Sequence, residues 1–327
     1  MPLAAANGRC VRARRYTAAM TRLAARLLFL FATLVARLPW RWLTRLADAL
    51  ADAAIRRSSR EARITARNLE LVRADASADE HAELQRAVMR STTRQVFETL
   101  RLWTGPRAGN LAMIREVHGA AHLDAAIAAG SGVIVAAPHF GNWELLNQWL
   151  ASRTPLAILY APPESRVGEA FLNLARADED AARITQVRAD GAGVRQLFKR
   201  LAAGGVVGIL PDQQPKRGDG EFAPFFGLQA LTMTLLGRLA TRSGATVLMA
   251  WCERIDDEGR GPAFALHVEP APAAVSDPDP ATSAAALNAA VERIARRDPA
   301  QYQWTYKRFS VRPPGSGEEN PYWPGCY

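Results

Sequence analysis

The spacing of apolar residues changes along the chain and divides it into three parts. Residues 27–36 form an apolar run between two arginines, and residues 46–118 are rich in alanine, leucine and arginine, as helices are. From residue 119 onward, short apolar runs alternate with amphipathic stretches, which predicts strands alternating with helices. We therefore predict an α/β fold with a mostly parallel sheet flanked by helices, and an N-terminal membrane-associated helical extension.

The predicted elements of the α/β part follow in order. Strands are expected at residues 133–137, 156–160, 184–187, 206–210 and 246–252, with a late edge strand at 264–268. Helices are expected at residues 123–129, 143–150, 168–178, 194–203, 232–243 and 283–297. The simplest division gives a basic arm and anchoring helix (1–45), a helical segment packing on the core (46–118), the α/β core (119–312) and a tail (313–327).

The most hydrophobic segment follows residues 1–16, a basic stretch that we expect to be a flexible arm. As a helix, residues 27–36 would rise only ~15 Å, about half of a hydrocarbon layer of ~30 Å. Trp40, Arg41 and Trp42 then supply interfacial anchors. A membrane-inserted or monotopic helix is therefore favoured over a full crossing. The alternatives are a secretory signal, for which no convincing cleavage site follows, and an ordinary buried helix.

The central apolar run, residues 133–137, has no alternation, which suits a strand covered on both faces. His139 then lies at the carboxyl end of a strand, where open α/β sheets place their ligands. Gly141 lets the backbone turn, and Glu144 lies in the first turn of an amphipathic helix. From there Glu144 can accept a hydrogen bond from one imidazole nitrogen, while the other nitrogen removes a proton from a substrate hydroxyl.

The start of this helix offers further groups for catalysis. The backbone N–H groups of Gly141, Asn142 and Trp143 are candidate donors to an oxyanion. The motif contains neither serine nor cysteine, so we expect direct attack by an acceptor hydroxyl, without an acyl-enzyme.

A second apolar strand, residues 206–210, also ends in polar groups, Asp212 and Gln213. A parallel sheet would place them at the same edge as the motif histidine. We expect them to orient the acceptor sugar or the catalytic loop; the alternative is an aspartate that only caps a turn. Lys216 and Arg217 on the following loop are candidates to meet a phosphate.

The sequence HFGNWE at residues 139–144 resembles the His-x4-Asp/Glu motif of the lysophospholipid acyltransferase superfamily, in the form carried by the late (lauroyl/myristoyl) acyltransferases of bacterial lipid A biosynthesis. Further matching blocks follow in order: LPDQ at 210–213, APFFG at 223–227 with Thr232, QYQW at 301–304 and YKRF at 306–309. The resemblance covers roughly residues 64–312. It implies transfer of a fatty acyl chain from acyl-carrier-protein to a hydroxyl of a phosphorylated, partly acylated glucosamine disaccharide, at the cytoplasmic face of the bacterial inner membrane.

The resemblance also implies further substrate-binding residues. Phe226 and Thr232 would line the acyl and head-group region, and Lys307 and Arg308 would meet the phosphorylated lipid. On their chemistry alone, a core position is favoured for Phe226, and Thr232 could simply cap the helix that follows.

One position departs from the family pattern. Where many members have Tyr-Arg-Pro after the second strand, this chain has Ala161 after the tyrosine, and Arg166 is a candidate substitute. The departure leaves the identity of the acceptor more open than the reaction.

Composition narrows the partners. The chain has 327 residues, 49 % of them hydrophobic, a formal charge of +9 and a pI near 10.1, which favours anionic partners such as lipid head groups. The arginines are interspersed on alanine-rich helices without a nucleic-acid-binding motif, so nucleic acid is not expected. The three cysteines are scattered, which fits a reducing compartment, and we expect neither a metal nor another cofactor.

Three alternatives stay open at this point. The same chemistry could act on a glycerolipid, an amino-acid lipid or another glycolipid. Water could replace the acceptor hydroxyl, which would make the protein an acyl-thioester hydrolase. The chain could also be a non-catalytic membrane protein on the same scaffold. Acyl chain length, the acylated hydroxyl and the oligomeric state do not follow from the sequence.

Overall fold

The computed structural model describes residues 3–160, 165–175, 183–255 and 261–327. Its centre is a seven-stranded sheet in the order β1-β9-β8-β2-β5-β3-β4. All its neighbouring strands are parallel except β8 and β9, so the predicted fold class is confirmed. The strands are β1 (Ile114–His118), β2 (Val133–Ala136), β3 (Leu156–Tyr160), β4 (Ile184–Arg188), β5 (Val206–Ile209), β8 (Thr246–Ile255) and β9 (Ala263–Pro270).

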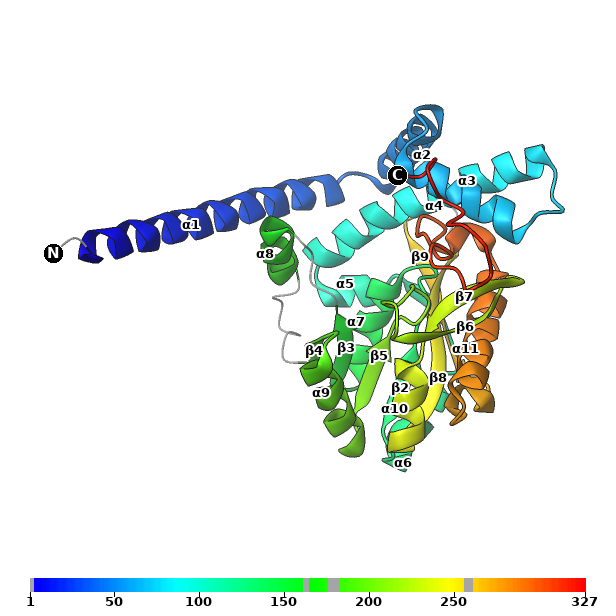
Figure 1. The fold of residues 1–327 in the computed structure, drawn as a ribbon. Helices are drawn as coiled ribbons and strands as arrows, with labels where there is room; N and C mark the ends of the chain where they lie inside the picture. The colour runs from blue at the N-terminus through cyan, green and yellow to red at the C-terminus, as the bar shows by residue number, and fades with distance from the viewer. Residues whose placement is uncertain (1–2, 161–164, 176–182, 256–260) are drawn as a thin grey trace.

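Helices cover both faces of this sheet (Figure 1). One buried cluster joins α6, α7 and the end of α4 to the sheet, and the other joins α9, α10 and α11 to its opposite face. All four residues of β2 are buried between these layers, as its apolar run predicts. The helices of this part are α3 (Arg60–Val72), α4 (Ala78–Thr104), α5 (Arg107–Leu111), α6 (Ala120–Ala129), α7 (Trp143–Arg153), α8 (Arg166–Ala175), α9 (Gly191–Ala202), α10 (Leu235–Ser243) and α11 (Pro280–Ala295), with short 3-10 turns η2 (Ala273–Ser276) and η3 (Pro299–Gln301).

Two predicted features of the sheet are wrong. Ile114–His118, expected to be helical, is the edge strand β1, and it pairs in parallel with β9. The expected edge strand at 264–268 is therefore internal, between β1 and β8. β1 could not be predicted from its sequence, IREVH. Four of its five residues are exposed, so it lacks the apolar run of a core strand.

A separate hairpin follows the main sheet. Its strands are β6 (Gly220–Phe225) and β7 (Leu228–Met233), joined by Phe226 and Gly227, which both have positive φ. Two such residues make the tight turn that a two-residue hairpin favours. The helix predicted from residue 232 therefore begins later, at Leu235 of α10.

The N-terminal helices extend from this body (Figure 1). α1 runs from Leu3 to Ala36, so the expected flexible arm at residues 1–16 is instead helical from Leu3 onward. Ala25 and Ala32 of α1 are buried beside α8, whereas most of the larger apolar side chains between residues 19 and 36 are exposed. Ala19–Ala36 is the one stretch in the described residues that is long and apolar enough to cross a membrane, and α2 (Trp40–Arg56) follows it.

Candidate active site

His139 lies in the loop between β2 and α7, and backbone hydrogen bonds hold this loop at the carboxyl edge of the sheet. The Gly141 N–H donates to the Gln301 carbonyl at 3.1 Å, and the Asn142 N–H donates to the Cys252 carbonyl at 2.8 Å. Gly141 has φ +57°, and a Cβ there would lie 2.0 Å from the Cys252 oxygen, so only glycine fits. The loop is therefore fixed by β8 and by the segment after α11.

The imidazole of His139 is held by Asp212, which follows β5. Nδ1 lies 2.7 Å from one carboxylate oxygen of Asp212, and the backbone N–H of His139 donates to the other at 2.9 Å. Because a carboxylate only accepts, Nδ1 carries the proton and Nε2 is the basic nitrogen. This geometry is that of a histidine and acid pair prepared to remove a proton from a hydroxyl.

Asp212 is ionised although its side chain is only 3 % exposed. Burial alone would favour the neutral acid, but the positive charge that His139 carries when protonated and the hydrogen bonds from its ring and backbone N–H together lower the pKa of Asp212 below the usual value. Burial raises the pKa of the neighbouring Tyr302 well above its ordinary value, and the Asp212 charge adds to this effect. Tyr302 is therefore a neutral phenol beside the carboxylate.

Gln213 occupies the other side of the ring. Its amide nitrogen lies 3.2 Å from Nε2 of His139 and donates to the Gln303 side-chain oxygen at 3.1 Å. Any hydroxyl that hydrogen-bonds to Nε2 would have to take the place of this amide group. Asp212 and Gln213 thus both contact His139, and their role in orienting the catalytic loop stays a prediction.

Glu144 is placed differently from the expectation. Asp212 and Gln213 fill the positions beside the two ring nitrogens, where the sequence argument put Glu144. The reason lies in the sheet, because β2 and β5 are adjacent parallel strands and bring residues 73 apart to one edge. Glu144 is buried and lines a large cavity beside the loop.

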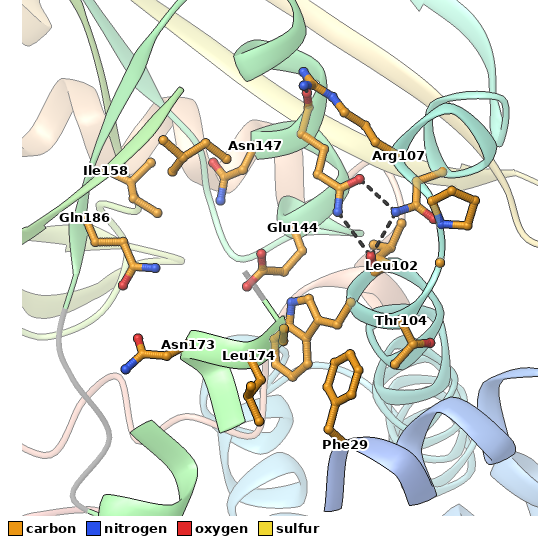
Figure 2. Close-up of a pocket in the computed structure, with 17 residues that line it drawn as sticks. Phe29, Leu102, Thr104, Arg107, Glu144, Asn147, Ile158, Asn173, Leu174 and Gln186 are labelled. Atoms are coloured by element: carbon orange, nitrogen blue, oxygen red, sulfur yellow. Dashed lines mark hydrogen bonds between the residues drawn. The ribbon is translucent and has the colours of Figure 1, made fainter. Parts of the chain in front are cut away.

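This cavity has a volume of about 910 Å³ and lies between the sheet and the N-terminal helices (Figure 2). Its wall combines side chains of α1, α4, α5, α7, α8, β3 and β4. Figure 2 shows Glu144, Asn147, Gln186 and Asn173 around one space, with Phe29 of α1 nearby. His139 is not among the lining residues, so Glu144 is the motif residue that joins the cavity to the histidine loop, and a concave site of this size is suited to a substrate.

The predicted oxyanion donors are partly used within the fold. The N–H groups of Gly141 and Asn142 have backbone acceptors, so they are not available to a substrate, and the prediction is wrong for them. The Asn142 side chain instead caps α7 by accepting from the Leu145 N–H at 3.2 Å. Within the described residues no hydrogen bond uses the N–H of Trp143, the first residue of α7, which leaves it as the remaining donor.

Comparison with known proteins identifies the family. The model of the bacterial lipid A biosynthesis acyltransferases matches residues 13–310. The chain belongs to this family. The lipid A biosynthesis lauroyltransferase of Escherichia coli K12 is 29 % identical over 283 residues, covering 86 % of this chain and 90 % of that protein. The palmitoleoyltransferase of the same organism is 28 % identical over 256 residues, 77 % of this chain and 79 % of that protein.

Another relative is named for a different lipid acceptor. A phosphatidylinositol mannoside acyltransferase of Mycobacterium tuberculosis is 31 % identical over 160 residues, which are 47 % of this chain and 48 % of that protein. All these relatives are named as acyltransferases, and the chain is accordingly an acyltransferase of lipid A synthesis.

A buried ion pair supports the motif loop of this lipid A acyltransferase and was missed by the sequence argument. Arg254 of β8 pairs with Glu98 of α4 and donates to the Ser91 hydroxyl at 2.9 Å. The Asn142 amide also donates to Glu98, at 3.2 Å. Burial lowers the pKa of Arg254, but the Glu98 charge and hydrogen bond outweigh it and raise that pKa overall. The pair therefore ties α4 and β8 to the start of α7.

Two residues expected to meet substrate belong instead to the folded core of the acyltransferase. Arg308 is 4 % exposed and donates to the Leu231 carbonyl at 2.6 Å and to the Thr232 hydroxyl at 2.8 Å. Thr232 is fully buried, and its hydroxyl also bonds the Asn288 side chain. Because both have protein partners inside the core, we assign them to holding β7 against α11 rather than to the lipid.

The remaining substrate-binding candidates are at or near the surface. Phe226 is half-buried against Trp304, with ring centroids 5.1 Å apart, and the Lys307 ammonium lies over the ring of Tyr327. Three cations are exposed: Arg166, Lys216 and Arg217. Ala161, where the family pattern is interrupted, lies outside the described residues.

Proposed function

We propose that this acyltransferase moves a fatty acyl chain from an acyl-carrier-protein thioester to a hydroxyl group of a lipid A precursor. The observation that carries the proposal is the hydrogen bond of 2.7 Å between His139 and Asp212 at the carboxyl end of β2. The names of the relatives support a lauroyl or similar chain as the transferred group and a lipid A precursor as its acceptor. The basic charge of the chain suits two anionic substrates.

His139 acts as the general base in this proposal. Its Nε2 removes the proton from the acceptor hydroxyl, and the hydroxyl oxygen attacks the thioester carbonyl carbon. When the tetrahedral intermediate collapses, the carbon–sulfur bond breaks, and the imidazolium returns the proton to the thiolate. Asp212 stabilises the imidazolium through Nδ1, and a base positioned in this way contributes typically ~10²–10⁴-fold to the rate.

Glu144 remains a catalytic candidate as the second acid of the motif. It lies in the first turn of α7, in the wall of the cavity beside the histidine loop. Its carboxylate can accept a hydrogen bond from a substrate group held there, which would place the attacking hydroxyl near Nε2 of His139.

We also propose that the protein works at the cytoplasmic face of the bacterial inner membrane. Leu27, Leu30, Phe31 and Leu34 of α1 are all more than half exposed, and Trp42 of α2 follows them. Such an apolar helix with an aromatic anchor is typical of membrane insertion. The exposed cations Arg166, Lys216 and Arg217 are suited to the phosphates of the acceptor or the carrier.

A transfer assay with purified protein tests the catalytic proposal. We expect His139→Ala to lower transfer from lauroyl-acyl-carrier-protein to a tetra-acylated lipid A precursor by at least about 10²-fold, because the base is removed. His122→Ala is the matched control, since His122 is exposed on α6. Transfer by His139→Ala near the parental rate would refute the assignment. Release of free fatty acid with every acceptor would instead favour the hydrolase.

The mycobacterial relative favours one second candidate, acylation of a different glycolipid. Mass spectrometry of lipids from cells lacking the protein distinguishes the two. We expect lipid A to lose one acyl chain. An unchanged lipid A together with an under-acylated glycolipid would support the second candidate.

A further inference from the structure

The cavity beside Glu144 contains polar side chains whose hydrogen bonds the fold leaves unused. Asn147 is only 6 % exposed, yet its carboxamide makes no hydrogen bond with any part of the chain that the structure describes. Two further carboxamides line the cavity, Gln186 of β4, which is half-buried, and Asn173 of α8, which is exposed, and neither makes a hydrogen bond within the described residues. Buried carboxamides are almost always hydrogen-bonded, so an unused one that faces a cavity indicates a ligand.

The arrangement of these groups follows from regular structure. Glu144 and Asn147 are three residues apart on α7 and therefore share one helix face. Gln186 lies opposite Ile158 in the β3–β4 pairing, and both side chains line the cavity. Figure 2 shows these side chains on different walls of the same space. A ligand group between them would meet donors and acceptors from three elements.

The charges of the cavity wall exclude one class of ligand. Arg107 is the cation among the described lining residues, and its guanidinium donates to the Gln148 carbonyl at 3.0 Å. Glu144 adds a carboxylate. Phosphates in proteins are held mainly by arginine and lysine, so a phosphate is disfavoured here. Carboxamides donate and accept at once, as hydroxyl and amide groups also do, and these are the groups they would bind.

The remaining wall is apolar. Phe29, Leu102, Ile158 and Leu174 line the cavity together with the polar groups. Phe29 belongs to α1, the helix on which Leu27, Leu30 and Phe31 are exposed. The ligand therefore combines neutral polar groups with an alkyl chain.

We propose that this cavity binds a neutral segment of one substrate that carries amide and hydroxyl groups next to an alkyl chain, through Asn147, Gln186 and Asn173, while the phosphates stay outside. The inference rests on the proposed function. Two substrate parts have this chemistry, the pantetheine arm of the acyl donor and the N-acylated amino sugar of the acceptor.

Binding measurements in a His139→Ala background separate this proposal from catalysis. The probes are decanoyl-pantetheine and N-decanoyl-glucosamine, each titrated calorimetrically into the full-length protein in detergent. The variants are Asn147→Leu and Gln186→Met, which keep side-chain size and remove the carboxamide. Gln229→Met on β7 is the matched control, because Gln229 is exposed and outside the cavity.

We expect each cavity variant to weaken one probe about three- to tenfold, the range for one lost hydrogen bond, and the pair together about 10- to 100-fold. The control should leave both affinities unchanged. Weaker binding of decanoyl-pantetheine would identify the donor arm as the ligand, and weaker binding of N-decanoyl-glucosamine would identify the acceptor. Gln186 lies on the edge strand β4, so its substitution tests the proposal even if Asn147→Leu does not fold.

Two outcomes would overturn the inference: parental protein that binds neither probe, or cavity variants that bind both probes as the control does. Failure of the proposed function would give a different result: the unsubstituted enzyme would not transfer the acyl chain, whatever the affinities measured in the His139→Ala background.

Discussion

His139 is held on three sides by residues that follow β5. Asp212 binds both the ring and the backbone N–H, and Gln213 lies against Nε2. The bidentate contact fixes the tautomer and the orientation of the ring at once, so little reorganisation is needed when a hydroxyl arrives. Because the Asp212 side chain is 3 % exposed, loss of its partner His139 would leave a buried charge without compensation.

Substitution of the two acids tells their roles apart. We expect Asp212→Asn to lower kcat about 10²–10⁴-fold with little change in KM, because the imidazolium loses its counter-charge. Glu144→Gln should change KM as well, since Glu144 faces the cavity. Initial rates over a range of acceptor concentrations measure both. If Asp212→Asn is nearly fully active and Glu144→Gln is not, Glu144 is the orienting acid.

At this scale the sequence predicted the place of His139 at the end of a strand, but not the acid that contacts its ring. His139 follows an apolar strand, and that signal is local. The partner of its ring depends on β2 and β5 being neighbours in the sheet, which no spacing in the sequence reveals. Arg308 shows the converse, because a cation among aromatics suggested a lipid site and is instead buried in the core.

Among the elements, α4 and β8 are joined by the Glu98–Arg254 pair, which also reaches Asn142 at the start of α7. The Glu98 side chain is 1 % and that of Arg254 15 % exposed, and each charge has hydrogen bonds besides the ion pair. Removal of one charge leaves the other buried and uncompensated, which is costly, whereas removal of both is often tolerated.

Two single substitutions and their combination test this link. We expect Glu98→Gln or Arg254→Met alone to lower the free energy of unfolding by about 3–5 kcal/mol, and the double variant to cost less than their sum. Denaturant unfolding measures this. Asp124→Asn is the control, because the Arg153–Asp124 pair is exposed and should contribute about 0–1 kcal/mol. Strict additivity of the two single effects would show that the pair is not coupled.

Most elements of the core could be predicted from periodicity, because their apolar runs and helix faces are complete. Leu156–Tyr160 matched its predicted bounds. The elements that failed have weak local signals: β1 is exposed along most of its length, and the β6–β7 turn uses Phe226 at positive φ, where a glycine or asparagine would have been the usual sign.

For the whole molecule, the main asymmetry is between the packed body and α1. One side of α1 contacts α8 and α4 through Ala25 and Ala32, and the other side presents leucines and Phe31. A surface of this kind is unfavourable in water and favourable in a bilayer.

Charged substitutions on α1 test the membrane surface. We expect Leu30→Asp or Leu34→Asp to weaken binding to vesicles of phosphatidylethanolamine and phosphatidylglycerol about tenfold or more each, because a buried leucine is worth about 1.5–3 kcal/mol. Co-sedimentation measures binding. Val117→Asp on β1 is the control, an exposed apolar residue outside α1 and α2. Unchanged partitioning of both α1 variants would contradict membrane insertion of this helix.

α1 has two surfaces with different roles. Its exposed leucines face outward, and Phe29 forms part of the wall of the cavity beside Glu144. Its ring also meets Phe171 of α8, with centroids 6.2 Å apart. A shortened protein without α1, made to avoid detergent, would therefore have this cavity, the proposed substrate site, open on one side. Its low turnover would reflect a missing wall and not only a lost anchor.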